Sequence, residues 1–231
     1  MPVITLIPGL ACDAQLWREQ AAALAPLGPV RVADVHTRFA TLPEMAAALL
    51  AETDGDLHLV GTSMGGMVAL EVARQAPQRV RSLALLATSA RPDTPELLQL
   101  RRDAIVLFEQ GRMREVLQAN VAFAFHPEHA AALAPPYLQM IERAGAGQLI
   151  AQNRAIMARG DYRPGLAAIG CPTLVVCGHD DRLTPPEHSQ EIAAGIAGAR
   201  LELLDDCGHL LTWEQPARVG ALLLDWLRGR S

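Results

Sequence analysis

The sequence predicts an α/β fold: a doubly wound, mostly parallel sheet of about six strands that carries a helical cap insertion. Short runs of aliphatic and β-branched residues alternate with longer stretches of helix-forming residues along the chain. Most of the short runs are apolar throughout, which is typical of parallel strands covered by helices on both faces. At 231 residues the chain is long enough for one such domain and too short for two, so we expect residues 1–231 to form a single domain.

The first two strands are expected near the start of the chain, each followed by a helix. Residues 3–7 are an apolar run, and an Ala-rich stretch at 15–24 follows after a loop that begins with Pro-Gly. Residues 30–34 are the second run, and residues 42–52 have the Ala- and Leu-rich composition of a helix.

The third strand, at residues 57–61, stops abruptly at a serine between glycines. A helix is expected directly after it at residues 64–75, and a fourth strand at residues 80–86. A strand that passes into a helix within a few residues needs a sharp backbone turn, which the glycines permit.

The segment between residues 90 and 166 has no strand-like run and is rich in helix-forming residues. Residues 97–117 and 138–157 carry apolar residues at helical spacing. We therefore expect residues 90–166 to form a helical cap inserted in the sheet domain. The alternative is a pair of crossover helices, but such connections are usually far shorter.

The sheet is expected to resume after this insertion. Residues 173–177 and 200–204 are the fifth and sixth strands, and helices are expected at residues 186–197 and 216–227. No linker, repeat or low-complexity tract separates the insertion from the sheet, which favours one domain.

The composition excludes several classes of function. The formal net charge is −5 and aromatic residues make up 4%, which argues against a nucleic-acid binder. All 20 basic residues are arginine, so the chain has neither the Schiff-base lysine of pyridoxal enzymes nor the lysine of a P-loop. No G-x-G-x-x-G pattern occurs either, and we expect no cofactor.

The chain has the features of a cytoplasmic protein. Its first residues are apolar but lack a basic region and are interrupted by Pro8 and Gly9, which indicates a strand and not a signal peptide. No apolar run approaches the ~20 residues that a transmembrane helix requires. The four cysteines form no C-x-x-C pair and are expected to be free thiols.

The segment Gly61-Thr62-Ser63-Met64-Gly65 fits the pattern G-x-S-x-G. A serine on a turn between a strand and a helix has a strained backbone, and the residues two positions away must be nearly free of side chain. Gly61 and Gly65 meet this requirement. The turn directs the Ser63 hydroxyl out of the carboxyl edge of the sheet and points the Met64 amide toward a developing negative charge.

A base and an acid for this serine are expected after the last two strands. The segment Gly178 to Pro185, with aspartates at its centre, follows the fifth strand, and Cys207-Gly208-His209 follows the sixth. Functional loops of open parallel sheets lie at this edge. The chain order serine, aspartate, histidine is that of hydrolytic triads on such sheets.

Together these motifs resemble the α/β-hydrolase superfamily, and the resemblance extends from residues 6–9 to residues 213–216. It implies that Ser63 is the nucleophile, that His209 is the general base and then the general acid, and that Asp181 orients the base. It also implies that the site needs no metal.

The acid has two alternatives. The Gly-x-x-Asp pattern of the family favours Asp181 over the neighbouring Asp180, which we expect to be a solvated or capping residue. Asp93, after the fourth strand, is the second alternative, because some members of the family place the acid there.

The resemblance further implies an oxyanion hole formed by the backbone amides of Leu10 and Met64. Members of the family usually carry His-Gly before the first donor, whereas this chain has Pro8-Gly9 and so lacks a loop-orienting hydrogen bond. Members also usually begin with a β-hairpin before this loop. Here we expect a trimmed parallel sheet of six strands.

The expected substrate is a small or medium carboxylic ester, cleaved through an acyl-enzyme as in small capped bacterial carboxylesterases. Enol-lactonases and carbon–carbon bond hydrolases share the triad and are alternatives, as is a ligand-binding signalling module with slow turnover. Met157, Arg154 and Arg159, near the return of the cap to the sheet, are expected to line the pocket.

A basic stretch in the cap has two interpretations. Arg101, Arg102, Arg112 and Arg114 form either a solvated helix face or a docking surface for an acyl carrier protein. The first interpretation is the commoner one for such stretches.

Other polar residues are expected to have structural roles. His126 and His129 have a spacing that could hold a metal, but no second cluster completes a set of four ligands, so no metal site is expected. His36 is expected at the surface or in a loop. Cys12 and Cys207 are expected to be packing residues, because nothing in the sequence lowers the pKa of either thiol.

Overall fold

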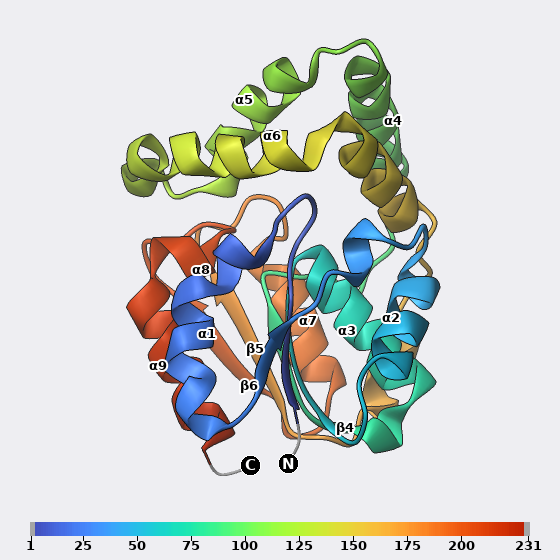
Figure 1. Ribbon diagram of the computed structural model, residues 1–231, viewed down its shortest axis with the longest axis vertical. Coiled ribbons are helices and arrows are strands. Elements are labelled where there is room, and N and C mark those ends of the chain that lie inside the picture. Colours follow the sequence, from blue (N-terminus) through green and yellow to red (C-terminus); the bar gives the residue numbers. More distant parts are fainter. Residues whose placement is uncertain (1–2, 229–231) are drawn as a thin grey trace.

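The computed structural model describes residues 3–228 and contains a six-stranded sheet whose neighbouring strands are all parallel (Figure 1). The order of the strands is β2-β1-β3-β4-β5-β6. The predicted sheet is confirmed, and it is parallel throughout rather than mostly parallel. Residues 1–2 and 229–231 of the expected single domain lie outside the described residues. The strands are β1 (Val3–Ile7), β2 (Val30–Val32), β3 (Leu57–Thr62), β4 (Val80–Leu86), β5 (Thr173–Gly178) and β6 (Arg200–Leu204).

The helices expected on the two faces of the sheet are present. The first of them begins as a 3₁₀ turn, Ala14–Trp17, that continues into α1, and the short helix α8 is an addition to the predicted set. α2 begins with a capping box in which Thr41 and Glu44 satisfy each other's backbone amides. These helices are α1 (Arg18–Leu24), α2 (Leu42–Ala51), α3 (Met64–Gln75), α7 (Pro186–Gly195), α8 (Leu211–Glu214) and α9 (Pro216–Leu227).

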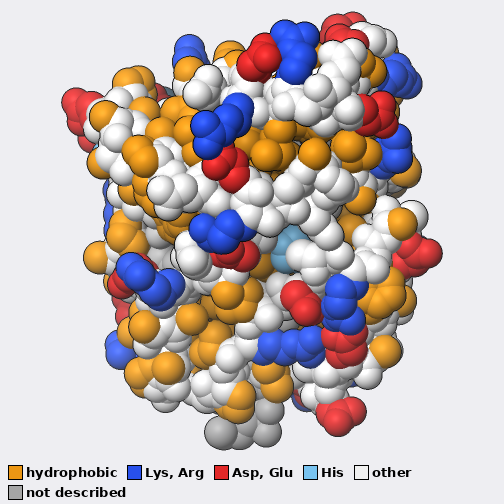
Figure 2. Space-filling model, turned by 45° about the horizontal axis from the view of Figure 1, so that its top comes forward, with side chains coloured by type: hydrophobic (Ala, Val, Ile, Leu, Met, Phe, Trp, Pro, Cys, Tyr) orange, Lys and Arg blue, Asp and Glu red, His pale blue; other side chains and the backbone are white. Residues whose placement is uncertain are grey.

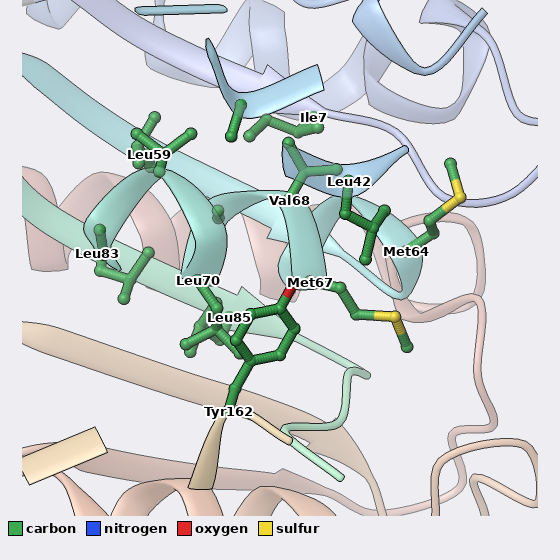
Figure 3. Packing of buried hydrophobic residues seen from close by; sticks show 14 of the residues in the cluster. Ile7, Leu42, Leu59, Met64, Met67, Val68, Leu70, Leu83, Leu85 and Tyr162 are labelled. Carbon is green, nitrogen blue, oxygen red and sulfur yellow. The ribbon is translucent and has the colours of Figure 1, made fainter. Parts of the chain in front are cut away.

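Helices cover both faces of the sheet, which is why its central strands are apolar throughout. α1 and α9 lie on one face, and α2, α3 and α7 lie on the other (Figure 1). On the first face Leu24 and Leu223 are fully buried. On the second face Leu70 of α3 packs beside the strand residues Leu83 and Leu85 (Figure 3).

The connections of two neighbouring strands, β1 and β3, run to opposite faces of the sheet. β1 leads to α1 on one face, and β3 leads directly to α3 on the other. Open parallel sheets bind their ligands at the carboxyl edge where connections diverge in this way. The loops at this point carry Leu10 and Ser63, so the topology alone brings these two residues to the same end of neighbouring strands.

Three helices separate β4 from β5 in the chain and lie across the carboxyl end of the sheet (Figure 1). They are α4 (Pro95–Glu109), α5 (Met113–Ala124) and α6 (Pro127–Met157), and we call them the α4–α6 layer. The layer packs on the loop after β1, because Ala11 of that loop shares a small buried cluster with Phe108 and Leu149.

The predicted helical stretches of this layer need two corrections. The stretch 97–117 is divided between α4 and α5, because Gly111 has a left-handed backbone (φ 76°) that ends α4. The stretch 138–157 belongs to α6, which begins already at Pro127 and changes direction at Gly145 (φ 78°). None of the helices within residues 3–228 combines the length and apolar composition needed to span a membrane.

Candidate active site

Ser63 lies at the sharp turn between β3 and α3 that the G-x-S-x-G pattern predicts. Its backbone has φ 52° and ψ −120°, which is strained for a residue with a side chain. The glycines are required here: a Cβ on Gly61 would overlap the backbone of Gly65, and a Cβ on Gly65 would overlap the carbonyl oxygen of Ile7. The Thr88 hydroxyl donates a 2.6 Å hydrogen bond to the Ser63 carbonyl oxygen, so the loop after the neighbouring strand β4 also holds the turn.

Ser63, His209 and Asp181 form a continuous hydrogen-bonded relay that we call the Ser–His–Asp relay. The Ser63 Oγ lies 3.0 Å from Nε2 of His209. The other ring nitrogen, Nδ1, lies 2.8 Å from Oδ2 of Asp181 and 3.0 Å from its Oδ1. His209 and Asp181 are buried, whereas Ser63 is partly exposed. This arrangement can transfer the hydroxyl proton to the imidazole while the carboxylate stabilises the resulting imidazolium.

The carboxylate of Asp181 is held by its own loop as well as by His209. Its Oδ1 accepts hydrogen bonds from the amides of Leu183 and Thr184, both at 2.9 Å, and its Oδ2 accepts one from the Thr184 hydroxyl at 2.9 Å. Burial raises the pKa of Asp181, but the charge of His209 and these hydrogen bonds outweigh burial, and the pKa lies below its ordinary value. The carboxylate is therefore ionised at neutral pH and fixed in orientation.

The two amides predicted for an oxyanion hole belong to segments that touch. Leu10 follows Gly9, where a Cβ would lie only 3.3 Å from the Cβ of Ser63, and Met64 begins α3 directly after Ser63. Within residues 3–228, neither the Leu10 amide nor the Met64 amide donates a hydrogen bond to another protein group. Both N–H groups are free to bind an oxygen atom next to Ser63.

The loop that carries Leu10 is held by two residues that the sequence analysis does not assign to the site. Gln152 of α6 is buried, and its Oε1 accepts a 2.6 Å hydrogen bond from the Ala11 amide. The Nε2 of His36 lies 2.8 Å from the carbonyl oxygen of Cys12. His36 is 3% exposed, so the expectation of a surface position is wrong. No local pattern signals either contact, because both residues lie far from this loop in the chain.

We expect His36 to make the protein less stable in weakly acidic solution. Burial lowers the pKa of His36, and the Cys12 carbonyl and nearby aspartates offset this effect only in part. The unfolded chain therefore takes up a proton at a higher pH than the folded protein does. The stability that results is present above the ordinary histidine pKa and is lost as the pH falls below it.

The measurement is the free energy of unfolding in urea, for wild type and His36→Gln, at several pH values between about 7 and about 5. The slopes of this free energy against pH should differ between the two proteins by up to about 1.4 kcal/mol per pH unit. The exposed His179 provides the control, since His179→Gln should keep the wild-type slope. An unchanged slope in His36→Gln would show that burial of this imidazole does not govern the acid response.

A further residue, Glu214, joins the loop after β6 to the α4–α6 layer. Its buried carboxylate accepts hydrogen bonds from the amides of Gly208 (3.0 Å) and His126 (2.8 Å), and it lies 3.1 Å from Nδ1 of His129. A Cβ on Gly208 would come within 2.7 Å of the His126 nitrogen, so the two segments are in direct contact. The backbone next to His209 is therefore held by the layer. The sequence shows Glu214 within a Glu-Gln-Pro segment, but no local pattern predicts its hydrogen bonds to Gly208 and His126.

The alternative acids lie elsewhere. Asp180 is exposed, and its Oδ2 is 4.0 Å from Nε2 of His126. Asp93 is buried in ion pairs with Arg101 at 2.6 Å and with Arg159 at 2.8 Å. Neither carboxylate contacts the imidazole of the Ser–His–Asp relay.

Two of the three residues expected to line the pocket are engaged by other groups. Arg154 is exposed and forms an ion pair with Glu109 at 3.1 Å. The guanidinium of Arg159 is held by Asp93 and by the carbonyl oxygen of Arg91. Within the described residues neither arginine has a polar contact with the Ser–His–Asp relay, and the place of both at the pocket stays a prediction. Met157 is half-buried, and its place at the pocket stays a prediction.

Other reactive side chains near the site are engaged structurally. Burial raises the pKa of Cys12 to about 12 and also raises the pKa of Cys207, so both thiols stay protonated. The rings of His126 and His129 lie 5.6 Å apart, centroid to centroid. In the part of the chain that the structure describes, no group of three or more His, Cys, Asp or Glu residues could hold a metal ion.

Comparisons with known proteins agree with this fold. A model of the alpha/beta hydrolase fold family matches residues 2–216. The chain is 29% identical to the 2-hydroxy-6-oxo-6-phenylhexa-2,4-dienoate hydrolase of Comamonas testosteroni, over 75% of this chain and 63% of that enzyme. The chain thus spans less than two thirds of the length of this relative.

Two further proteins are similar over nearly their whole length. The pimeloyl-(acyl-carrier protein) methyl ester esterase of Neisseria meningitidis serogroup B is 26% identical over 98% of this chain and 93% of its own. The crystal structure of the enol-lactonase from Burkholderia xenovorans LB400 superposes with a TM-score of 0.87 and 26% identity, covering 98% of this chain and 91% of that one. The sheet, the turn at Ser63 and the family match lead to one conclusion: the chain belongs to the α/β-hydrolase fold family.

Proposed function

We propose that this chain is a serine hydrolase that cleaves small or medium carboxylic esters through an acyl-enzyme. The observation that carries the proposal is the Ser–His–Asp relay, with the unpaired amides of Leu10 and Met64 next to its serine. A nucleophile, a base held by a carboxylate and two donors without another partner are the parts that acyl transfer requires.

In the first half of the reaction, the Ser63 Oγ attacks the carbonyl carbon of the ester while Nε2 of His209 accepts the hydroxyl proton. The π electrons of the carbonyl move to its oxygen, where the amides of Leu10 and Met64 stabilise the negative charge. Collapse of this intermediate breaks the bond to the alcohol oxygen, which takes the proton from His209 and leaves. Water then repeats the sequence on the acyl-enzyme and releases the carboxylic acid.

We also propose that residues 90–166 act as a cap that supplies an apolar wall to the site. The α4–α6 layer lies across the carboxyl end of the sheet (Figure 1). Leu138 and Ile150 of α6 belong with Leu10 to the apolar cluster that joins the layer to the loop after β1. An apolar neighbourhood beside an oxyanion donor favours an ester whose acyl or alcohol part is itself apolar.

The form of the substrate that we favour is a free small molecule rather than a carrier-bound ester. The name of the Neisseria relative includes an acyl carrier protein. An acidic carrier protein would need free basic side chains on the α4–α6 layer to dock on. In this chain Arg101, Arg112 and Arg114 already form ion pairs, and of the basic stretch only Arg102 has no acidic partner among the described residues. Figure 2, in which the layer comes forward, shows basic and acidic side chains next to one another rather than one continuous basic area.

Two alternatives use the same relay on other bonds. The enol-lactonase from Burkholderia xenovorans has this fold, and a lactone is an internal ester that the same acyl transfer would open. The name of the Comamonas relative describes a keto-dienoate without an ester, so its hydrolysis would break a different bond. A ligand-binding module with slow turnover is the alternative outside catalysis.

The test is a series of p-nitrophenyl esters from acetate to laurate, with an enol-lactone added as a separate substrate. We expect turnover of the short or medium esters by wild type, an optimum in chain length and no turnover by the Ser63→Ala variant. Turnover of the lactone without turnover of any p-nitrophenyl ester would contradict the ester proposal and favour the enol-lactonase alternative. Stoichiometric binding of a ligand without turnover of any substrate would contradict the hydrolase proposal.

A further inference from the structure

The loop after β1 determines where the Leu10 amide points. The Cys12 amide donates a 3.2 Å hydrogen bond to the carbonyl oxygen of Gly9. In a trans peptide the C=O and N–H groups point in opposite directions, so this bond also sets the direction of the Leu10 N–H. The next residue, Ala11, has a left-handed backbone with φ 55°, which is costly for a residue with a side chain. The loop therefore depends on partners outside itself.

Gln152 of α6 is the main outside partner, although it lies 141 residues from Ala11 in the chain. Its Oε1 accepts the 2.6 Å hydrogen bond from the Ala11 amide, and its Nε2 donates to the carbonyl oxygen of His36 at 2.9 Å. The His36 ring in turn lies 2.8 Å from the carbonyl oxygen of Cys12. Gln152 is 1% exposed, so water cannot replace these bonds.

We propose that Gln152 is a positioning residue of the active site, which holds the Ala11 peptide so that the Leu10 amide points at the oxygen of the reacting carbonyl. The inference rests on the proposed function, because it assumes that Ser63 is the nucleophile. A primary amide suits this position because it accepts a hydrogen bond from one peptide and donates one to another. The α4–α6 layer thus orients an oxyanion donor as well as covering the site.

The decisive variant is Gln152→Met, which keeps the length of the side chain and removes its hydrogen bonds to Ala11, to His36 and to the side chain of Gln148. We expect kcat for a p-nitrophenyl ester to fall about 10- to 100-fold with KM within about threefold, because a misdirected donor weakens binding of the transition state more than of the substrate. A merely structural role would not produce this division between kcat and KM.

Binding of a trifluoromethyl ketone tests the Leu10 amide as a donor without requiring turnover. The Ser63 Oγ adds to the ketone carbon, its proton moves to His209, and the negative charge forms on the ketone oxygen. The affinity for this inhibitor should fall in Gln152→Met by about the same factor as kcat/KM.

Gln148, one turn earlier on α6, provides a matched control. Its Nε2 donates a 2.8 Å hydrogen bond to the carbonyl oxygen of Thr37, so Gln148→Met also removes a contact between the layer and the sheet domain. Its Oε1 accepts a 2.9 Å hydrogen bond from Nε2 of Gln152, so this variant removes one bond of Gln152 but leaves the bond to Ala11 in place. We expect Gln148→Met to keep kcat and the inhibitor affinity of wild type within about twofold, since Oε1 of Gln152 still accepts the hydrogen bond from the Ala11 amide. Gln152→Glu, which retains an oxygen that accepts from Ala11, should lose less activity than Gln152→Met.

The outcomes separate this inference from the proposed function. If Gln152→Met lowers the melting temperature but matches Gln148→Met in kcat and in inhibitor affinity, Gln152 is only structural and the inference is overturned. If Gln152→Met does not fold, Gln152→Glu decides: because its carboxylate oxygen can still accept from the Ala11 amide, a fall in kcat and in inhibitor affinity of more than about 100-fold in this variant overturns the role assigned to that bond. If wild type forms the trifluoromethyl ketone adduct at Ser63 but hydrolyses no ester, the ester proposal is refuted. The role of Gln152 is then decided by the inhibitor affinity of Gln152→Met alone.

Discussion

We expect the Ser63→Ala variant to lose on the order of 10⁶-fold in kcat for ester hydrolysis. At about 1.4 kcal/mol for each factor of ten, this corresponds to about 8 kcal/mol of barrier. The loss is this large because no other side chain is placed to replace the Ser63 Oγ, which lies 3.0 Å from Nε2 of His209. The nearby Cys12 thiol does not substitute for it, since burial raises its pKa to about 12.

The measurement combines steady-state hydrolysis with mass spectrometry of the intact protein after rapid acid quenching. Wild type should gain the mass of one acyl group, and the Ser63→Ala variant should gain none. Ser89→Ala is the control: Ser89 is a buried serine whose hydroxyl accepts from the Arg91 amide, and its replacement should leave kcat within about threefold of wild type. Hydrolysis by the Ser63→Ala variant at the wild-type rate would show that another group is the nucleophile.

The second large effect is expected for Asp181→Asn, which should lower kcat by about 10³- to 10⁴-fold. The pKa of Asp181 lies below its ordinary value, so the substitution removes a full negative charge at neutral pH. The side-chain amide can also donate to Nδ1 of His209 and so leave the proton on Nε2, where the imidazole cannot accept the proton of Ser63. KM should change little, because this carboxylate is fully buried against His209.

The two other aspartates serve as controls for this assignment. Asp180→Asn changes the adjacent residue, which is exposed, and should keep kcat within about threefold. Asp93→Asn breaks a buried ion-pair cluster with Arg101 and Arg159, so its main effect should be a lower melting temperature. If Asp93→Asn abolished activity at an unchanged melting temperature while Asp181→Asn remained active, Asp93 would be the acid.

The sheet and the turn at Ser63 were predictable because their signals are local. A strand covered on both faces must be apolar over a few consecutive residues, and a turn from β3 into α3 needs glycine at fixed offsets from Ser63. The boundaries inside the α4–α6 layer were less predictable. Gly111 and Gly145 sit within stretches of otherwise helical composition, and only their backbone angles show where one helix ends and another bends.

By itself, the sequence determined the order of strands and helices and the chain order Ser63, Asp181, His209. Only the tertiary structure decided which side chains hold these loops in place. Gln152 supports the loop of Leu10, and Glu214 ties the loop after β6 to the start of α6. The physical reason is that such contacts join residues that are distant in the chain, and a hydrogen bond between them exists only once packing has set the separation and direction of its two groups.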